Sequence, residues 1–142
     1  MNTDLGFVTA PRGGSWSVAQ ATAIVFGIWW TINGLGALLI DPNFSSGHVH
    51  GSGTLLGLVT ITANGWHGVF HLLTGIAGIA VARRPHASLL YTLAVGALYI
   101  AVGALGLILG GSALGVIAVD SSGDIVHTAE GALVFGAGLL TV

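Results

Sequence analysis

Long apolar runs separated by short polar breaks make up most of the chain. Each run is close to the roughly 20 residues that an α-helix needs to cross about 30 Å of hydrocarbon. We therefore predict a four-transmembrane-helix domain over residues 16–142, with helices at about 16–40, 64–84, 87–109 and 124–142. Residues 1–15 include Pro and Gly and show no apolar periodicity, which predicts a flexible arm before the first helix.

The composition is that of a membrane protein. Of the 142 residues, 54% are apolar and 6% are charged, whereas a soluble domain has about 25% charged residues. With three basic residues and a net charge of −2, the chain has no basic surface for nucleic acid. It has no Cys, which excludes disulfides and thiolate metal ligands. We expect its partners to be the lipid bilayer and other membrane-protein subunits or further copies of itself.

The basic residues predict the orientation of the helices. Arg12 precedes the first predicted helix, and Arg83 and Arg84 stand between the second and the third. All three then lie on one side of the membrane, and basic loops are typical of the cytoplasmic side. We expect a multi-pass protein of the bacterial inner membrane with both termini in the cytoplasm.

The two halves of the chain share a pattern of residues. Motifs of the first half recur in the same order in the second, Gly27-x-x-Trp30-x-x-x-Gly34 as Gly96-x-x-Tyr99-x-x-x-Gly103 and Asn64-x-x-His67 as Asp124-x-x-His127. This predicts an all-α integral membrane four-helix bundle made of two tandem parallel-repeat helical hairpins. Such a repeat brings His67 and His127 close together. The repeated glycines indicate close helix packing, within the bundle or between copies.

Polar side chains near the outer ends of the second and fourth predicted helices form the candidate site. Ionisable groups at that depth are costly in hydrocarbon and therefore face a protein interior, a cavity or a ligand. His67 and His71 are one turn apart and present two nitrogens from one face of a helix. Imidazole and carboxylate ligands suit zinc, copper, iron or manganese. We predict a metal site made of His67, His71, His127 and Glu130, supported by Asn64 and Asp124, with His48 and His50 as further loop ligands.

The same residues allow other interpretations. His67 and His127 can instead bind haem, because haem takes two opposed imidazoles. The polar side chains can also form a proton path, or bond backbone carbonyls and one another and so brace the ends of the helices. The sequence contains no G-x-S-x-G or H-E-x-x-H pattern, so we assign no catalytic residue and favour a protein that is not an enzyme.

The run NGWHGVFHLLTGIAGIAVARRP, the later run LYTLAVGALYIAVGALGLILG and the motif Asp124-x-x-His127 resemble a family of small four-helix membrane proteins. The family is frequent in actinobacteria and known only as a domain of unknown function. The resemblance covers about residues 20–142, and its most specific part is the N-x-x-H-x-x-x-H-x-x-x-G motif that begins at Asn64. It implies a four-helix topology and a role for the two His motifs, and it implies no reaction. Glu130 departs from the family pattern.

We expect a non-catalytic accessory or assembly subunit that packs through its Gly-rich helix faces against a larger membrane complex or against itself. The alternative is a metal- or haem-binding membrane protein with its site at the outer ends of the second and fourth helices. The first is favoured because the chain shows no soluble domain, no catalytic motif and no charged pore lining.

Overall fold

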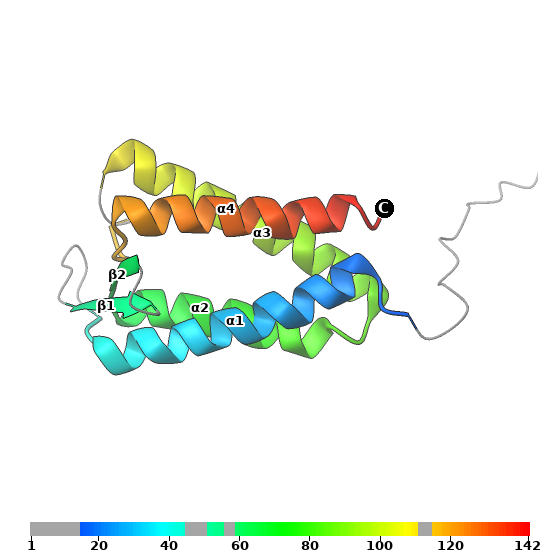
Figure 1. Ribbon diagram of the computed structural model, residues 1–142, viewed down its shortest axis with the longest axis horizontal. Coiled ribbons are helices and arrows are strands. Elements are labelled where there is room, and N and C mark those ends of the chain that lie inside the picture. The colour runs from blue at the N-terminus through cyan, green and yellow to red at the C-terminus, as the bar shows by residue number, and fades with distance from the viewer. Residues whose placement is uncertain (1–14, 45–50, 56–58, 111–114) are drawn as a thin grey trace, which may run out of the picture.

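Two antiparallel helical hairpins lie side by side and form the body of the protein (Figure 1). The computed structural model describes residues 15–44, 51–55, 59–110 and 115–142. Helix α1 pairs with α2 and α3 pairs with α4, while a short β-hairpin covers one end. The elements are α1 (Val18–Ile40), β1 (Gly51–Leu55), β2 (Val59–Ala63), α2 (Gly65–Val81), α3 (Pro85–Leu109) and α4 (Ser121–Leu139).

The helices begin at residues that cap them. Ser17 and Gln20 form a capping box at the start of α1, in which each side chain accepts a hydrogen bond from the other's backbone N–H. Asn64 caps α2, and Pro85 is the first residue of α3. Helix α4 begins at Ser121 rather than at 124, because Asp120 accepts a hydrogen bond from the backbone N–H of Gly123 and so acts as the cap.

Glycines allow the two helices of each hairpin to approach closely. A Cβ atom at Gly27 would lie 3.0 Å from the carbonyl oxygen of Gly75, and one at Gly34 would lie 2.7 Å from that of Gly68. These distances leave no room for a side chain, which is the arrangement of small-residue seams between membrane helices. The glycines that the sequence places at bundle or oligomer seams therefore pack within the first hairpin.

The second hairpin repeats these contacts. A Cβ atom at Gly96 would lie 2.5 Å from the backbone nitrogen of Phe135, and one at Gly103 would meet the backbone of Thr128. Gly96 is the predicted counterpart of Gly27, and Gly103 is that of Gly34. Each contacts α4, the partner helix of its own hairpin.

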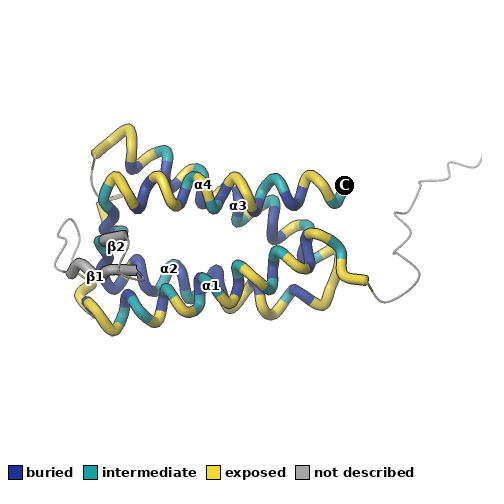
Figure 2. Tube along the Cα trace, viewed as in Figure 1, coloured by how far each residue is buried: buried dark blue, intermediate teal, exposed yellow. Residues whose placement is uncertain are grey.

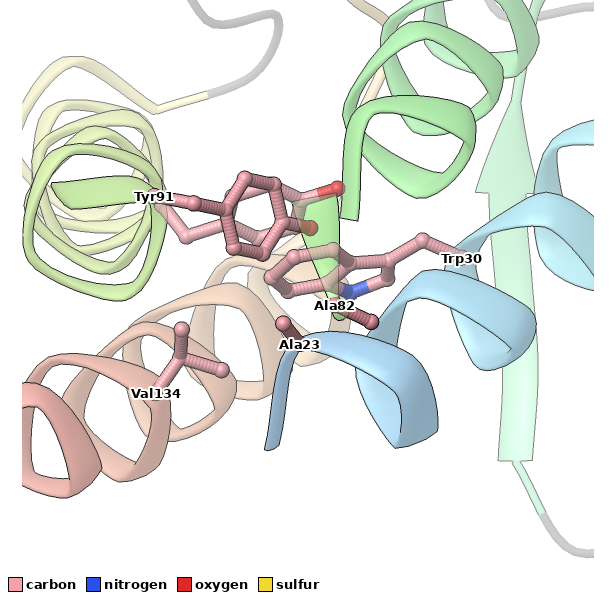
Figure 3. Close-up of a cluster of buried hydrophobic side chains, with 6 residues drawn as sticks. Ala23, Trp30, Ala82, Tyr91 and Val134 are labelled. Atoms are coloured by element: carbon pink, nitrogen blue, oxygen red, sulfur yellow. The ribbon is translucent and has the colours of Figure 1, made fainter. Parts of the chain in front are cut away.

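Buried side chains lie on the sides of the helices that face one another (Figure 2). At the centre, the ring of Trp30 from α1 stacks on the ring of Tyr99 from α3, with centroids 3.9 Å apart and planes inclined by 16°. Both rings are fully buried. Small or slender side chains surround them, including Ala23, Ala82 and Val134 (Figure 3). This aromatic pair is one of the contacts through which the two hairpins meet.

Large apolar side chains cover the outside of the helices. Leu39 is 86% exposed and Ile108 is 77% exposed. Helices α1 and α3 are long and apolar enough to cross a membrane, and α2 is a shorter apolar helix.

A β-hairpin lies in the segment between α1 and α2, for which the sequence analysis predicted no helix or strand. Strands β1 and β2 pair in antiparallel register, with Gly51 opposite Ala63 and Leu55 opposite Val59. The β2 sequence VTITA is rich in β-branched residues, which favour strands. Residues 1–14 of the predicted arm and the predicted loop ligands His48 and His50 lie outside the described residues.

Substitution of a seam glycine should destabilise the protein. In Gly75→Leu, the new Cβ atom would lie 2.5 Å from the backbone nitrogen of Thr31, and such overpacking costs at least about 2 kcal/mol of unfolding free energy. Gly36→Leu is the matched control, because nothing lies within 4 Å of a Cβ atom there. Thermal unfolding in detergent, followed by circular dichroism, should show a lower midpoint for Gly75→Leu alone. Equal midpoints would contradict the seam.

Candidate metal centre

Three histidines from the two hairpins point their Nε2 atoms toward one another. The Nε2 atoms of His67 and His71 on α2 are 2.8 Å apart, and Nε2 of His71 is 3.2 Å from Nε2 of His127 on α4. The three side chains are 3%, 6% and 3% exposed, in that order. One potential ligand atom from each lies within 4.8 Å of the others. The arrangement is a compact, buried set of nitrogen donors.

The outer nitrogen of His67 fixes its protonation state. Nδ1 of His67 lies 2.9 Å from the carbonyl oxygen of Ala118. A carbonyl oxygen only accepts hydrogen bonds, so Nδ1 carries the proton and donates it. In the neutral ring the lone pair is then on Nε2 and faces His71 and His127. A metal-binding histidine normally has this second partner, which sets its orientation and tautomer.

Hydroxyl groups hold the outer nitrogen of His71. Oγ1 of Thr74 lies 2.9 Å from the carbonyl oxygen of Phe70, 3.1 Å from that of His71 and 2.9 Å from the hydroxyl oxygen of Tyr99. The Tyr99 oxygen lies 3.0 Å from Nδ1 of His71. When Thr74 donates to a carbonyl and Tyr99 donates to Thr74, Nδ1 of His71 is the donor to Tyr99 and the lone pair of His71 is on Nε2.

At 2.8 Å, Nε2 of His71 can donate a hydrogen bond to the lone pair on Nε2 of His67. When His71 carries its proton on Nδ1 instead, both lone pairs face inward and can bind a metal ion. Ligand nitrogens of a tetrahedral zinc site, at about 2.0–2.1 Å from the ion, are about 3.3 Å apart. The observed separations of 2.8 and 3.2 Å are close to this value, so a small outward movement of the rings would accommodate an ion.

Two polar atoms near the third ligand have no hydrogen-bond partner among the described residues. They are Nδ1 of His127 and Oδ1 of Asp124, and both are buried. Asp124 packs against Gly106 of α3, where any side chain would overlap its carboxylate. Asp124 therefore lies inside α4 beside the centre, and the cap of that helix is Asp120.

Asn64 connects the start of α2 to the segment before α4. Its Oδ1 accepts hydrogen bonds from the backbone nitrogens of His67 at 3.0 Å and Ala118 at 3.3 Å. Its Nδ2 donates to the carbonyl oxygen of Val116 at 2.8 Å. Because Ala118 also accepts the hydrogen bond from the His67 ring, Asn64 fixes both partners of that bond.

Glu130 lies outside the cluster, although the sequence predicts it as a fourth ligand. Its Oε1 accepts a hydrogen bond from Nε1 of Trp29 at 2.6 Å, and its Oε2 accepts one from Nε1 of Trp30 at 2.8 Å. Two rigid indole donors from α1 thus hold the carboxylate. The structure brings together the three predicted histidine ligands, and it places the predicted carboxylate elsewhere.

Sequence reasoning did not identify the residues that orient the histidines. Tyr99 and Thr74 fix the His71 ring, and the carbonyl of Ala118 fixes His67. The carbonyl of Ala118 could not be predicted, because every residue has a backbone carbonyl. Tyr99 was a possible candidate, because it is the counterpart of Trp30 in the internal comparison and both rings belong to the centre of the bundle.

Haem does not fit this arrangement. Bis-histidine haem requires the macrocycle to lie between two opposed imidazoles. The ring centroids of His67 and His127 are 5.0 Å apart, and Nε2 of His71 lies within 3.2 Å of Nε2 of both. The His71 ring therefore occupies the space that a macrocycle between His67 and His127 would need.

Comparison with known proteins identifies a matching family model and assigns no activity. A family model described as "Domain of unknown function (DUF4383)" matches residues 20–140. A search of curated proteins and a search of solved structures each found no similar protein.

Removal of the Asn64 side chain should destabilise the protein more than removal of a matched amide. Asn64→Ala loses a helix cap and leaves buried backbone groups unpaired, which together cost about 2–3 kcal/mol of unfolding free energy. Asn33→Ala is the control, because Asn33 donates only within its own helix, to the carbonyl of Trp29. Chemical unfolding in detergent should separate the two variants, and equal stabilities would contradict the linking role of Asn64.

Proposed function

Because the chain belongs to the family described as Domain of unknown function (DUF4383), whose description assigns no activity, we propose a function from the site itself. The protein is a polytopic membrane protein that binds one transition-metal ion through His67, His71 and His127. The observation that carries this proposal is the convergence of three buried Nε2 atoms, two of them on rings whose Nδ1 atoms have hydrogen-bond partners outside the cluster.

The donor set selects the class of metal. Three imidazole nitrogens suit zinc, copper, nickel or ferrous iron, whereas magnesium and calcium prefer oxygen ligands. Three protein ligands leave one coordination position for water or an added anion. Since the three side chains are buried, we assign the ion a structural role rather than a catalytic one.

The ion would join the two hairpins. His67 and His71 belong to the first hairpin and His127 belongs to the second. Within a bilayer, helices gain little from the hydrophobic effect when they associate, because lipid tails are as apolar as the side chains. Bonds from both hairpins to one ion would supply the association energy that apolar contacts do not.

The same proposal includes the topology. We place all four helices across the bacterial plasma membrane as two tandem parallel repeats. The equivalent glycine contacts of the two hairpins support the repeat. The start of α1, the turn with Arg83 and Arg84, and the C-terminus lie at one end of the bundle (Figure 1), which favours a cytoplasmic position for that end.

Metal binding can be measured on the full chain in detergent. After treatment with a chelator, the wild-type protein should bind one Co²⁺ per chain with visible d–d bands, and zinc should displace it. His71→Ala removes a ligand and should weaken binding by at least about 100-fold, since loss of a partner that merely orients a ligand already costs about 10- to 100-fold.

His86→Ala serves as the control for this experiment. His86 is an exposed imidazole at the start of α3, outside the cluster, so the variant should bind Co²⁺ as the wild type does. Retention of wild-type affinity by His71→Ala, or absence of bound metal in the wild type, would refute the proposal. In the second case a hydrogen bond between Nε2 of His67 and Nε2 of His71 would account for their separation of 2.8 Å.

An accessory role through self-association is the second candidate function. One observation favours it: the outward face of α1 carries an apolar stripe with the i, i+3, i+7 spacing of a helix-packing seam. Its members are all exposed and are Val25, Ile28, Ile32, Leu35 and Leu39. Two copies related by a two-fold axis would pack these stripes together.

If two copies associate through this stripe, a larger side chain within it should disrupt the dimer. Ile32→Trp should convert a dimer in mild detergent into a monomer, because the larger ring prevents close approach of the two helices. Ile108→Trp changes an exposed position on α3 and should leave the dimer intact. Light scattering coupled to size exclusion gives the mass of the protein. A monomeric wild-type protein would remove this candidate.

A further inference from the structure

A second polar group lies outside the histidine cluster, at the indole nitrogens of Trp29 and Trp30. The Glu130 carboxylate accepts one indole hydrogen bond at each oxygen, from Trp29 and Trp30. A carboxylate has about four lone-pair sites, so these two bonds leave further accepting capacity. Two fixed N–H dipoles also stabilise negative charge at this position.

The chain supplies no counter-charge to this carboxylate along its own helix. The sequence has three basic residues, Arg12, Arg83 and Arg84, and none after Arg84. Glu130 lies near the middle of α4, whereas Arg83 and Arg84 lie in the turn before α3. An unpaired carboxylate in an apolar setting is costly and must bind a proton or another cation.

A pocket adjoins this carboxylate between α1 and α4. It has a volume of about 340 Å³ and is lined by Val25, Phe26, Trp29, Glu130 and Leu133. The volume lies within the range of about 300–1,000 Å³ that is usual for small-molecule sites. Val25 and Leu133 are exposed, so the pocket opens on the outer surface of the bundle, the surface that contacts lipid if α1 and α4 cross the membrane.

We infer that this pocket binds a lipophilic monovalent cation. The apolar walls from Val25 and Leu133 suit a hydrophobic body, and the faces of Phe26 and Trp29 attract a cation through their ring quadrupoles. The single carboxylate of Glu130 supplies the opposite charge. A soft organic cation matches this site better than a metal ion, because the pocket lining contributes no second ligand atom from a charged side chain.

This site is independent of the histidine cluster. The indole of Trp30 and the hydroxyl of Tyr99 separate the two, since Trp30 bonds Glu130 while Tyr99 contacts His71. Binding of an organic cation should therefore be the same in metal-free and metal-loaded protein. Failure of the metal proposal would leave this one standing, and the reverse also holds.

The probe for the experiment is radiolabelled tetraphenylphosphonium, a cation with a permanent charge. The full chain in detergent should bind it in a saturable manner, and the neutral analogue triphenylphosphine oxide should not compete. Glu130→Gln removes the charge at constant shape and should weaken binding by at least about tenfold, as expected for loss of a poorly solvated ion pair. Asp120→Asn is the matched control, because it removes one carboxylate and keeps a good helix cap.

Equal binding by wild type and Glu130→Gln would overturn the inference, as would competition by the neutral analogue or no saturable binding by the wild type. If Glu130→Gln fails to fold, labelling of the wild type with dicyclohexylcarbodiimide decides instead. An oxygen of the protonated carboxyl bonds to the carbodiimide carbon, its proton moves to a nitrogen, and acyl migration gives an N-acylurea that adds the mass of one reagent. Tetraphenylphosphonium should slow this labelling at Glu130 by at least about fivefold, and no protection would refute the site.

Discussion

The convergence of three imidazole nitrogens between two hairpins is the constraint on which the rest of the structure depends. The Nε2 atoms of His67 and His71 lie 2.8 Å apart, in a place where each ring is buried. Burial removes the water that would otherwise bond these nitrogens, while Ala118 and Tyr99 hold the Nδ1 atoms of the two rings. The inward nitrogens are therefore satisfied by one another or by a bound ion, so the geometry of the bundle centre and the chemistry of the site are one problem.

Hydropathy and local spacing were sufficient to predict the four helices, because each apolar run has the length of a membrane helix. The helix ends were less accessible to sequence reasoning. Helix α4 begins after Asp120 because that side chain reaches the Gly123 backbone, whereas the sequence analysis placed the start of this helix at about residue 124. The β-hairpin was not predicted, because β1 (GSGTL) is polar and Gly-rich and the alternation of apolar and polar residues in β2 (VTITA) extends over only five residues.

The histidines of the candidate site could be predicted from the sequence, whereas the residues that orient them could not. Spacing places His67 and His71 on one face of α2, and the internal comparison of the two halves relates His127 to His67. Glu130 follows His127 by almost one turn, so sequence reasoning assigned it to the same face. The structure differs because the indoles of Trp29 and Trp30 offer two N–H donors on the α1 side. Donors from another helix, which sequence spacing cannot reveal, decided where this carboxylate lies.

The inequality of the two halves explains how one bundle holds two kinds of polar site. In the proposed repeat, Trp30 and Tyr99 are equivalent, and they stack on each other at the centre. Their polar atoms serve opposite sides, since the indole of Trp30 donates to Glu130 and the hydroxyl of Tyr99 contacts His71. Where the first half has His71, the second has Gly131, whose missing side chain leaves room for the backbone of α3. Two hairpins with unequal side chains therefore hold a nitrogen-donor centre and a separate carboxylate, and the two members of one aromatic stack each contact one of these groups.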